Sequence, residues 1–188
     1  MNILGINNYF EHPAVAIISD GTLKFAMESE RFTRIKHGKS YTPFKTYIPF
    51  ETIYEALKSC ELKLEDIDEI AFSYSSKKHF RFMWGSLFGK RLSSFSDEWL
   101  AYKSAANIRR VLSSGYEIPE KYKDIMNPSF FSKIRFVEWD HHISHAASAF
   151  FYSGFEKSLV VVADGSGENS CTSVYRGRGN ELKKISQK

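Results

Sequence analysis

Residues 2–28 read NILGINNYFEHPAVAIISDGTLKFAME, and the fold prediction starts from this stretch. It contains three short apolar runs, Asn2–Asn7, Ala14–Ser19 and Thr22–Glu28. Their length and their β-branched and apolar residues are typical of strands. Asp20-Gly21, between the second and third runs, is a dipeptide that favours a tight β-hairpin. The stretch therefore predicts a meander of three strands.

A helix and a fourth strand are predicted next. Residues 50–60 carry apolar side chains at the three-and-four spacing of an amphipathic helix: Ile53, Tyr54, Leu57 and Cys60. After a turn at 64–68, residues 69–73 are another strand candidate, so the element order is β-β-β-α-β. Residues 77–131 mix aromatic with polar residues and predict a largely helical insertion, whose aromatics form a local core, a lid or an interface.

The second half of the chain begins a similar order of elements. A strand is predicted at 134–139, and a buried helix at 140–151 because small and apolar residues dominate there. Three further strand candidates follow, with a glycine turn at 177–179 between the last two: 159–163, 171–175 and 181–185.

Two subdomains are expected from this order: residues 1–157, including the insertion, and residues 158–188 as the opening strands of a second. No helix follows these last strands in the chain. We therefore expect one face of their sheet to stay uncovered unless more chain or a partner packs on it, and the sequence resembles a truncated domain.

Composition and charge exclude some classes of protein. The net charge is +4 and the basic residues are scattered, so the chain lacks the basic stripe of a nucleic-acid binder. No segment reaches the roughly 18 apolar residues of a membrane span, and the amino terminus lacks the pattern of a signal peptide. Cys60 and Cys171 lie far apart, which is typical of reduced thiols. These features predict a cytoplasmic protein that binds neither nucleic acid nor a membrane.

The predicted helix at 140–151 carries the pattern His141-x-x-x-His145. Residues four apart project from the same face of a helix, so both imidazoles can reach one metal ion. Asp164 ends the next predicted strand and is a candidate third ligand. His142 points elsewhere on the helix and donates a hydrogen bond or contacts substrate. The alternative is that these histidines are structural and hydrogen-bonded in the core.

Two further segments are candidate phosphate or substrate sites. In the first, Asp164-Gly165-Ser166-Gly167-Glu168, glycines after a buried strand can expose backbone N–H groups to an anion, although an ordinary β-turn has the same composition. The second is 28–37, whose basic residues Arg31 and Lys36 can grip a phosphate. In this segment a neutral His37 can act as general base for a hydroxyl. The alternative is a charged, solvated loop.

Taken together, the motifs resemble one family. The order from Ile3-Leu4-Gly5-Ile6-Asn7 through His12-Pro13 to the 28–37 segment is similar to the start of the NodU/CmcH/TobZ-type O-carbamoyltransferases. The runs 141–151 and 162–168 are similar to the central signature of that family. The resemblance covers nearly the whole chain except the 77–131 insertion. Many relatives have a His-Asp pair where this chain has Glu11-His12, so His12 replaces the usual aspartate or is shifted by one position.

The resemblance implies a fold, cofactors and partners. The fold is α/β, an actin-like or sugar-kinase-like (ribonuclease H-like) domain, and the chain is the amino-terminal part of an ATP-dependent enzyme. Iron, or another divalent metal, would be held by His141, His145 and Asp164, with a further aspartate outside this chain. A separate carboxyl-terminal domain would make carbamoyl-adenylate from ATP and carbamoyl phosphate. The carbamoyl group would pass to a small-molecule hydroxyl at a site lined by His12 and His37.

Other interpretations of the residues remain open. A phosphotransferase or ATPase of the same fold would use Asp164 as a base or a magnesium ligand, but has no obvious use for an H-x-x-x-H helix. A tRNA-modifying relative would need a larger basic surface. A non-catalytic scaffold would bind neither metal nor carbamoyl-adenylate. The residues identify neither the acceptor nor the oligomeric state, and a homo-oligomer is compatible with them.

Overall fold

The computed structural model describes residues 1–8, 12–38, 48–75, 118–165 and 167–188. Contacts divide the chain into two compact units. The first comprises Met1–Phe72 and Ser94–Glu138, and the second comprises Ser73–Ser93 and Trp139–Lys188. The subdomain division at residue 157 stays a prediction.

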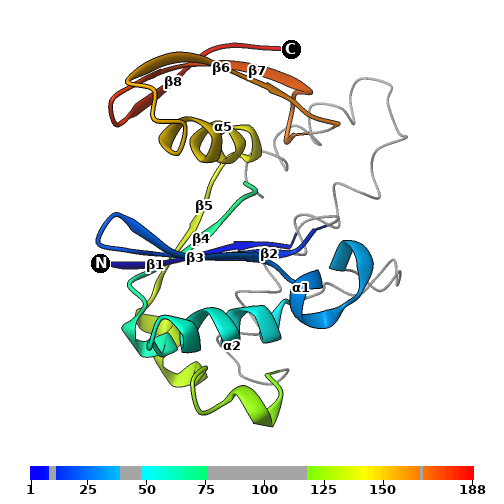
Figure 1. Ribbon diagram of the computed structural model, residues 1–188, viewed down its shortest axis with the longest axis vertical. Coiled ribbons are helices and arrows are strands. Elements are labelled where there is room, and N and C mark those ends of the chain that lie inside the picture. The colour runs from blue at the N-terminus through cyan, green and yellow to red at the C-terminus, as the bar shows by residue number, and fades with distance from the viewer. Residues whose placement is uncertain (9–11, 39–47, 76–117, 166) are drawn as a thin grey trace. The chain divides into compact units, whose positions relative to one another are not determined.

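The first unit is built on a five-stranded mixed sheet (Figure 1). Its strands are β1 (Asn2–Asn7), β2 (Ala14–Ser19), β3 (Thr22–Glu28), β4 (Glu69–Phe72) and β5 (Arg135–Glu138). They lie in the order β3-β2-β1-β4-β5, with β1 to β3 antiparallel and β4 and β5 parallel to β1. The predicted three-strand meander is confirmed. Asp20 and Gly21 both have positive φ, 49° and 77°, as the tight hairpin between β2 and β3 requires.

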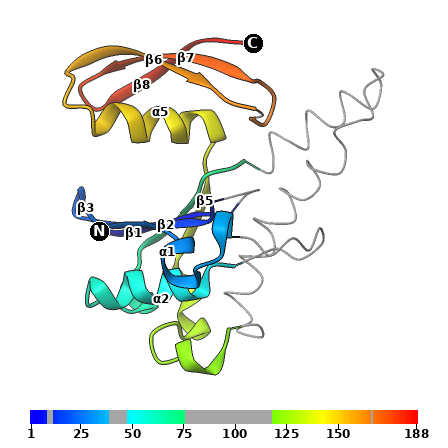
Figure 2. The same ribbon diagram turned by 45° about the vertical axis from the view of Figure 1, so that its right-hand side comes forward.

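Helix α2 (Phe50–Ser59) covers one face of this sheet against β2 and β3 (Figures 1 and 2). Its buried residues are Thr52, Ile53, Ala56 and Leu57, so the predicted amphipathic helix is confirmed. They pack over a core of alternate strand residues, which includes Leu4, Ile6, Val15, Ile17, Ile70 and Phe72. The remaining elements of this unit are short: α1 (Glu30–Thr33), η1 (Lys36–Gly38), η2 (Leu64–Asp66), η3 (Glu120–Tyr122) and η4 (Pro128–Lys133).

The second unit is a helix packed on a three-stranded antiparallel meander (Figures 1 and 2). Its elements are α5 (His141–Phe151), β6 (Lys157–Ala163), β7 (Thr172–Arg178) and β8 (Glu181–Gln187). The core is small: Ala146, Val162 and Tyr175 are buried, and partly buried apolar side chains surround them. The predicted helix is present, but it is buried on one face only, at His142, Ala146 and Phe150. The meander supplies cover on one side alone.

Gly177 corrects the predicted turn at 177–179. It lies inside β7, and the turn falls at Gly179 and the residue after it. A Cβ at Gly177 would lie 2.5 Å from the Phe150 ring, so the absence of a side chain lets α5 approach the sheet closely. Glycine therefore serves packing here, not chain reversal.

The face of the meander that α5 does not cover is exposed in the described part of the chain. Leu159 and Val161 on β6 are 68% and 65% exposed, and Ile185 on β8 is 57% exposed. By contrast, Val162 on the α5 side is 6% exposed. The strict alternation along β6 follows from the two-residue period of a strand.

The predicted helical insertion at 77–131 lies mostly outside the described residues. Its described part, 118–131, contains the short turns η3 and η4 and no long helix. Within the described chain, no helix combines the length and apolar character needed to cross a bilayer.

Candidate metal centre

Helix α5 presents two histidines on one face. Asp140 caps the helix: its Oδ1 accepts the N–H of Ile143 at 3.2 Å. From that start, His141 and His145 lie one helical turn apart, and their Nε2 atoms are 3.2 Å from each other. The i,i+4 spacing in the sequence therefore places two metal-ligand nitrogens side by side.

Asp164 joins this pair from the loop after β6. Its Oδ2 lies 2.8 Å from Nε2 of His141 and 3.5 Å from Nε2 of His145. The three ligand atoms all lie within 4.8 Å of one another. The His141 side chain is 15% exposed, whereas that of His145 is 52% exposed, so the cluster is open to solvent on the His145 side. We refer to His141, His145 and Asp164 as the HHD cluster.

The surroundings of His141 fit a metal ligand. Its Nδ1 lies 3.2 Å from the carbonyl oxygen of Ser73, and its Nε2 faces Asp164. A neutral imidazole has one N–H and can donate to only one of these oxygens. A cation bound by Nε2 and the carboxylate would remove that conflict, with the Nδ1–H donated to Ser73. Two imidazoles and a carboxylate also form the donor set that iron, zinc and similar divalent ions prefer.

Electrostatics in the HHD cluster favour ligands in their metal-binding forms. Burial, and then the neighbouring His141, lower the pKa of the His145 imidazole. Burial acts to raise the pKa of Asp164, but the Gly165 N–H and the adjacent His141 outweigh it and hold the pKa below its usual value. A neutral imidazole and an ionised carboxylate are the forms that coordinate metals. Metal binding itself stays a prediction.

In the predicted phosphate loop, the backbone N–H groups of the two glycines donate to acceptors within the loop and its flanking turn. Gly165 N–H donates to Oδ1 of Asp164 at 2.7 Å, and Gly167 N–H donates to the carbonyl oxygen of Ser170 at 2.9 Å. Ser166 lies outside the described residues. The loop is thus hydrogen-bonded as a turn in this conformation, and phosphate binding by it stays a prediction.

His142 is turned into the core of the second unit. It is 1% exposed, and its Nδ1 lies 2.8 Å from the Ser173 hydroxyl. Its Nε2 has no hydrogen-bond partner among the described residues. Burial, followed by the nearby His141, lowers the pKa of this imidazole. The ring thus has a hydrogen-bond contact with Ser173, and its expected roles as a donor or as a substrate contact stay predictions.

Glu168 belongs to the site although the sequence assigned it no role. It is 2% exposed, and its Oε1 accepts N–H groups from Ser75 and His141, both at 2.8 Å. Burial raises the pKa of this carboxyl, and the two N–H bonds oppose that shift. A glutamate beside a glycine-rich turn is usually solvated, so nothing local in the sequence distinguishes it.

A second histidine cluster lies in the first unit. His12 Nε2 is 3.3 Å from His37 Nδ1, and His12 Nδ1 is 3.6 Å from Glu28 Oε2. The backbone N–H of His12 donates to the backbone carbonyl oxygen of His37 at 3.0 Å, and the backbone N–H of His37 donates to Oε2 of Glu30 at 3.1 Å. Both histidines have positive φ, 55° and 61°, an uncommon conformation that these hydrogen bonds maintain. The structure thus brings together the two histidines predicted as catalytic.

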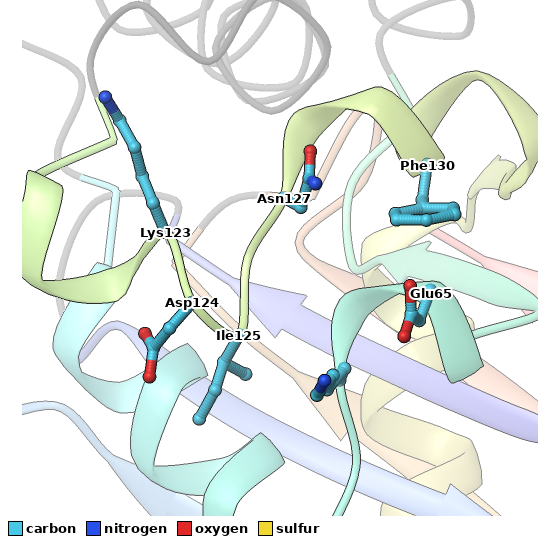
Figure 3. A pocket seen from close by; sticks show the side chains of 7 residues that line it. Glu65, Lys123, Asp124, Ile125, Asn127 and Phe130 are labelled. Atoms are coloured by element: carbon cyan, nitrogen blue, oxygen red, sulfur yellow. The ribbon is translucent and has the colours of Figure 1, made fainter.

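The predicted phosphate-gripping side chains are solvated. Arg31 lies 3.8 Å from Glu30 with its side chain 65% exposed, and Lys36 is exposed. A pocket of about 130 Å³ in the same unit is shown in Figure 3. Its lining is mixed in charge and includes none of the histidines: Lys63, Glu65, Lys123, Asp124, Ile125, Asn127 and Phe130. It carries no functional assignment.

Comparison with known proteins gives consistent matches across the chain. The family model described as Carbamoyltransferase N-terminus matches residues 2–187. Nodulation protein NolNO of Sinorhizobium fredii is 32% identical over 185 residues, covering 98% of this chain and 24% of the relative. The uncharacterized protein sll1178 of Synechocystis sp. is 33% identical over 189 residues, covering 96% of this chain and 28% of the relative. The chain thus spans about a quarter of the length of these relatives.

Among solved structures, YeaZ from Pseudomonas aeruginosa matches with a TM-score of 0.51 at 12% identity. The match covers 99% of this chain and 65% of YeaZ. At that identity the similarity shows the fold alone. YeaZ has an actin-like fold, so the predicted α/β, actin-like class is confirmed.

Proposed function

Since the chain belongs to the family of carbamoyltransferase N-termini, we propose that it is the amino-terminal part of an ATP-dependent O-carbamoyltransferase. The carbamoyl group moves from carbamoyl phosphate, through carbamoyl-adenylate, to the hydroxyl of a small-molecule acceptor. Formation of the adenylate belongs to a carboxyl-terminal domain outside this chain. The observation that carries the proposal is the convergence of the three atoms of the HHD cluster, within 4.8 Å, in a chain that matches this family.

His141, His145 and Asp164 would hold a divalent ion, with iron the expected metal. When bound, such an ion supplies Lewis-acid stabilisation of developing negative charge on an acyl oxygen. The protein's own contribution is to hold the ligands in place. Ser73 accepts from Nδ1 of His141, which keeps Nε2 directed at the ion, and the Gly165 N–H keeps Asp164 ionised.

The His12–His37 pair would handle the proton of the acceptor hydroxyl. Nδ1 of His37 is occupied by His12, so the proton would be taken by the other ring nitrogen, Nε2. Glu28 lies close to the far nitrogen of His12 and stabilises positive charge as it develops on the pair. Glu30 holds the His37 backbone through its N–H. This arrangement supports a general base with a carboxylate behind it.

The metal assignment is tested by anaerobic calorimetric titration with ferrous iron. The parent chain is expected to bind one ion, His145→Ala is expected to lose binding, and His12→Ala is the matched histidine control. Loss of binding in His12→Ala, with binding retained in His145→Ala, would place the ion at the other cluster, where His12 lies near Glu28 and Glu30. If neither this chain nor a longer polypeptide that includes the proposed carboxyl-terminal domain bound iron, the metal assignment would be wrong.

A further inference from the structure

We infer that Glu168 is a positioning residue for the HHD cluster: its buried carboxylate fixes the backbone around His141 and thereby the orientation of that imidazole. The inference deepens the proposed function and rests on it where it concerns metal affinity. The carboxylate is buried and is not one of the grouped ligand atoms of the HHD cluster, and both of its oxygens accept the His141 N–H, at 2.8 and 3.0 Å.

Glu168 accepts a backbone N–H at the start of helix α5. The leading N–H groups of a helix have no partner within it, and a carboxylate near them is favoured by the helix dipole. Two carboxylates act as acceptors here, because Asp140 accepts from Ile143 and Glu168 accepts from His141. Glu168 therefore holds the backbone N–H of His141, which is the first residue of the helix and a proposed metal ligand.

Glu168 also binds the chain segment that follows β4. Oε1 of Glu168 also accepts the N–H of Ser75 at 2.8 Å, across 93 residues of sequence. Two residues earlier, the Ser73 carbonyl lies 3.2 Å from Nδ1 of His141. One buried carboxylate thus holds both the backbone of His141 and the segment that presents an acceptor to its ring.

These contacts favour one tautomer of the His141 imidazole. An acceptor at Nδ1 keeps the proton on that nitrogen, which leaves Nε2 unprotonated and therefore able to coordinate a metal. Nε2 is the atom that faces Asp164 and His145. Without Glu168, the Ser75 and His141 N–H groups would lose a shared acceptor in a buried place, and the link between the 73–75 segment and the start of α5 would be weakened.

The test is a cobalt titration of the parent chain, Glu168→Ala and Asp140→Ala, each with its thermal midpoint. Asp140→Ala is the matched control because it removes the other carboxylate of the same helix start and does not involve the Ser75 N–H. Both variants are expected to lower the midpoint. Only Glu168→Ala is expected to lose affinity strongly, by about 10- to 100-fold, the range for residues that orient metal ligands. Equal affinity losses in the two variants would overturn the inference.

Two measurements keep the test decisive if Glu168→Ala folds poorly. Glu168→Gln retains one oxygen acceptor and is expected to bind cobalt more tightly than Glu168→Ala, and an equal loss would contradict positioning through hydrogen bonds. In metal-free protein, histidine nitrogen-15 spectra are expected to show a hydrogen-bonded Nδ1 proton on His141 that persists in Asp140→Ala and disappears without Glu168. A persisting Nδ1 signal in Glu168→Ala would refute the positioning role whether or not cobalt binds, whereas the metal proposal itself fails only if neither this chain nor a longer polypeptide with the further aspartate binds the ion.

Discussion

The imidazole of His142 occupies the space into which a side chain at Gly167 would project. A Cβ there would lie 2.7 Å from Nε2 of His142 and 3.0 Å from the Ser170 carbonyl oxygen. Since His142 is buried and bonded to Ser173, its ring has little room to move. At the scale of single residues, the glycine is thus required by a neighbour on α5.

Gly167→Ala is therefore expected to destabilise the second unit by about 1–3 kcal/mol, the usual cost of overpacking. Gly165→Ala is the control, because no atom of the described residues, its chain neighbours aside, lies within 4 Å of the added Cβ, and its expected change is within about 0.5 kcal/mol. Urea unfolding of the two variants measures the difference. Similar midpoints for both would show that His142 can move aside.

Strand β6 places two neighbouring valines in different environments, one buried and one exposed to solvent. Val162 faces α5 and is 6% exposed, whereas Val161 faces away and is 65% exposed. Both valines lie in the same strand and lose the same atoms on mutation to alanine, so a difference in stability would report the different packing and burial of the two faces.

Val162→Ala is expected to lower the free energy of unfolding by about 2 kcal/mol, from lost burial and the cavity left behind. Val161→Ala is expected to change it by less than about 0.5 kcal/mol. Thermal or urea unfolding of the matched pair measures both values. A large loss at Val161 instead would mean that the exposed face is covered by a partner in solution.

In the molecule as a whole, the three metal ligands proposed within this chain lie in the second unit, in α5 or directly after β6. A ligand stabilises the part of a protein that binds it, by about 2.7 kcal/mol at a hundred times its dissociation constant. Chelation of the metal is thus expected to increase amide hydrogen exchange in residues 141–187. Helix α2 in the first unit holds no ligand and is the internal reference. Mass spectrometry of peptides measures both, and unchanged exchange in α5 after chelation would contradict the assignment.

Local patterns in the sequence predicted most of the longer elements in the described part of the chain. The hairpin at Asp20-Gly21, the amphipathic α2 and the spacing of His141 and His145 depend on neighbours in the chain, and all are present. Side-chain periodicity and turn chemistry are local properties, so they can be predicted without knowing the fold. The order of motifs also indicated the family and its actin-like class.

Which residues come into contact depends on the three-dimensional packing of the chain. Asp164 reaches His141 across 23 residues, and Glu168 reaches Ser75 across 93. Likewise, the position of Gly177 inside β7 follows from the approach of Phe150, which no pattern around the glycine records. Such contacts depend on how strands pair and how a helix packs on them. That information is distributed over the whole chain, because strand register and helix placement are determined by burial and not by local propensity.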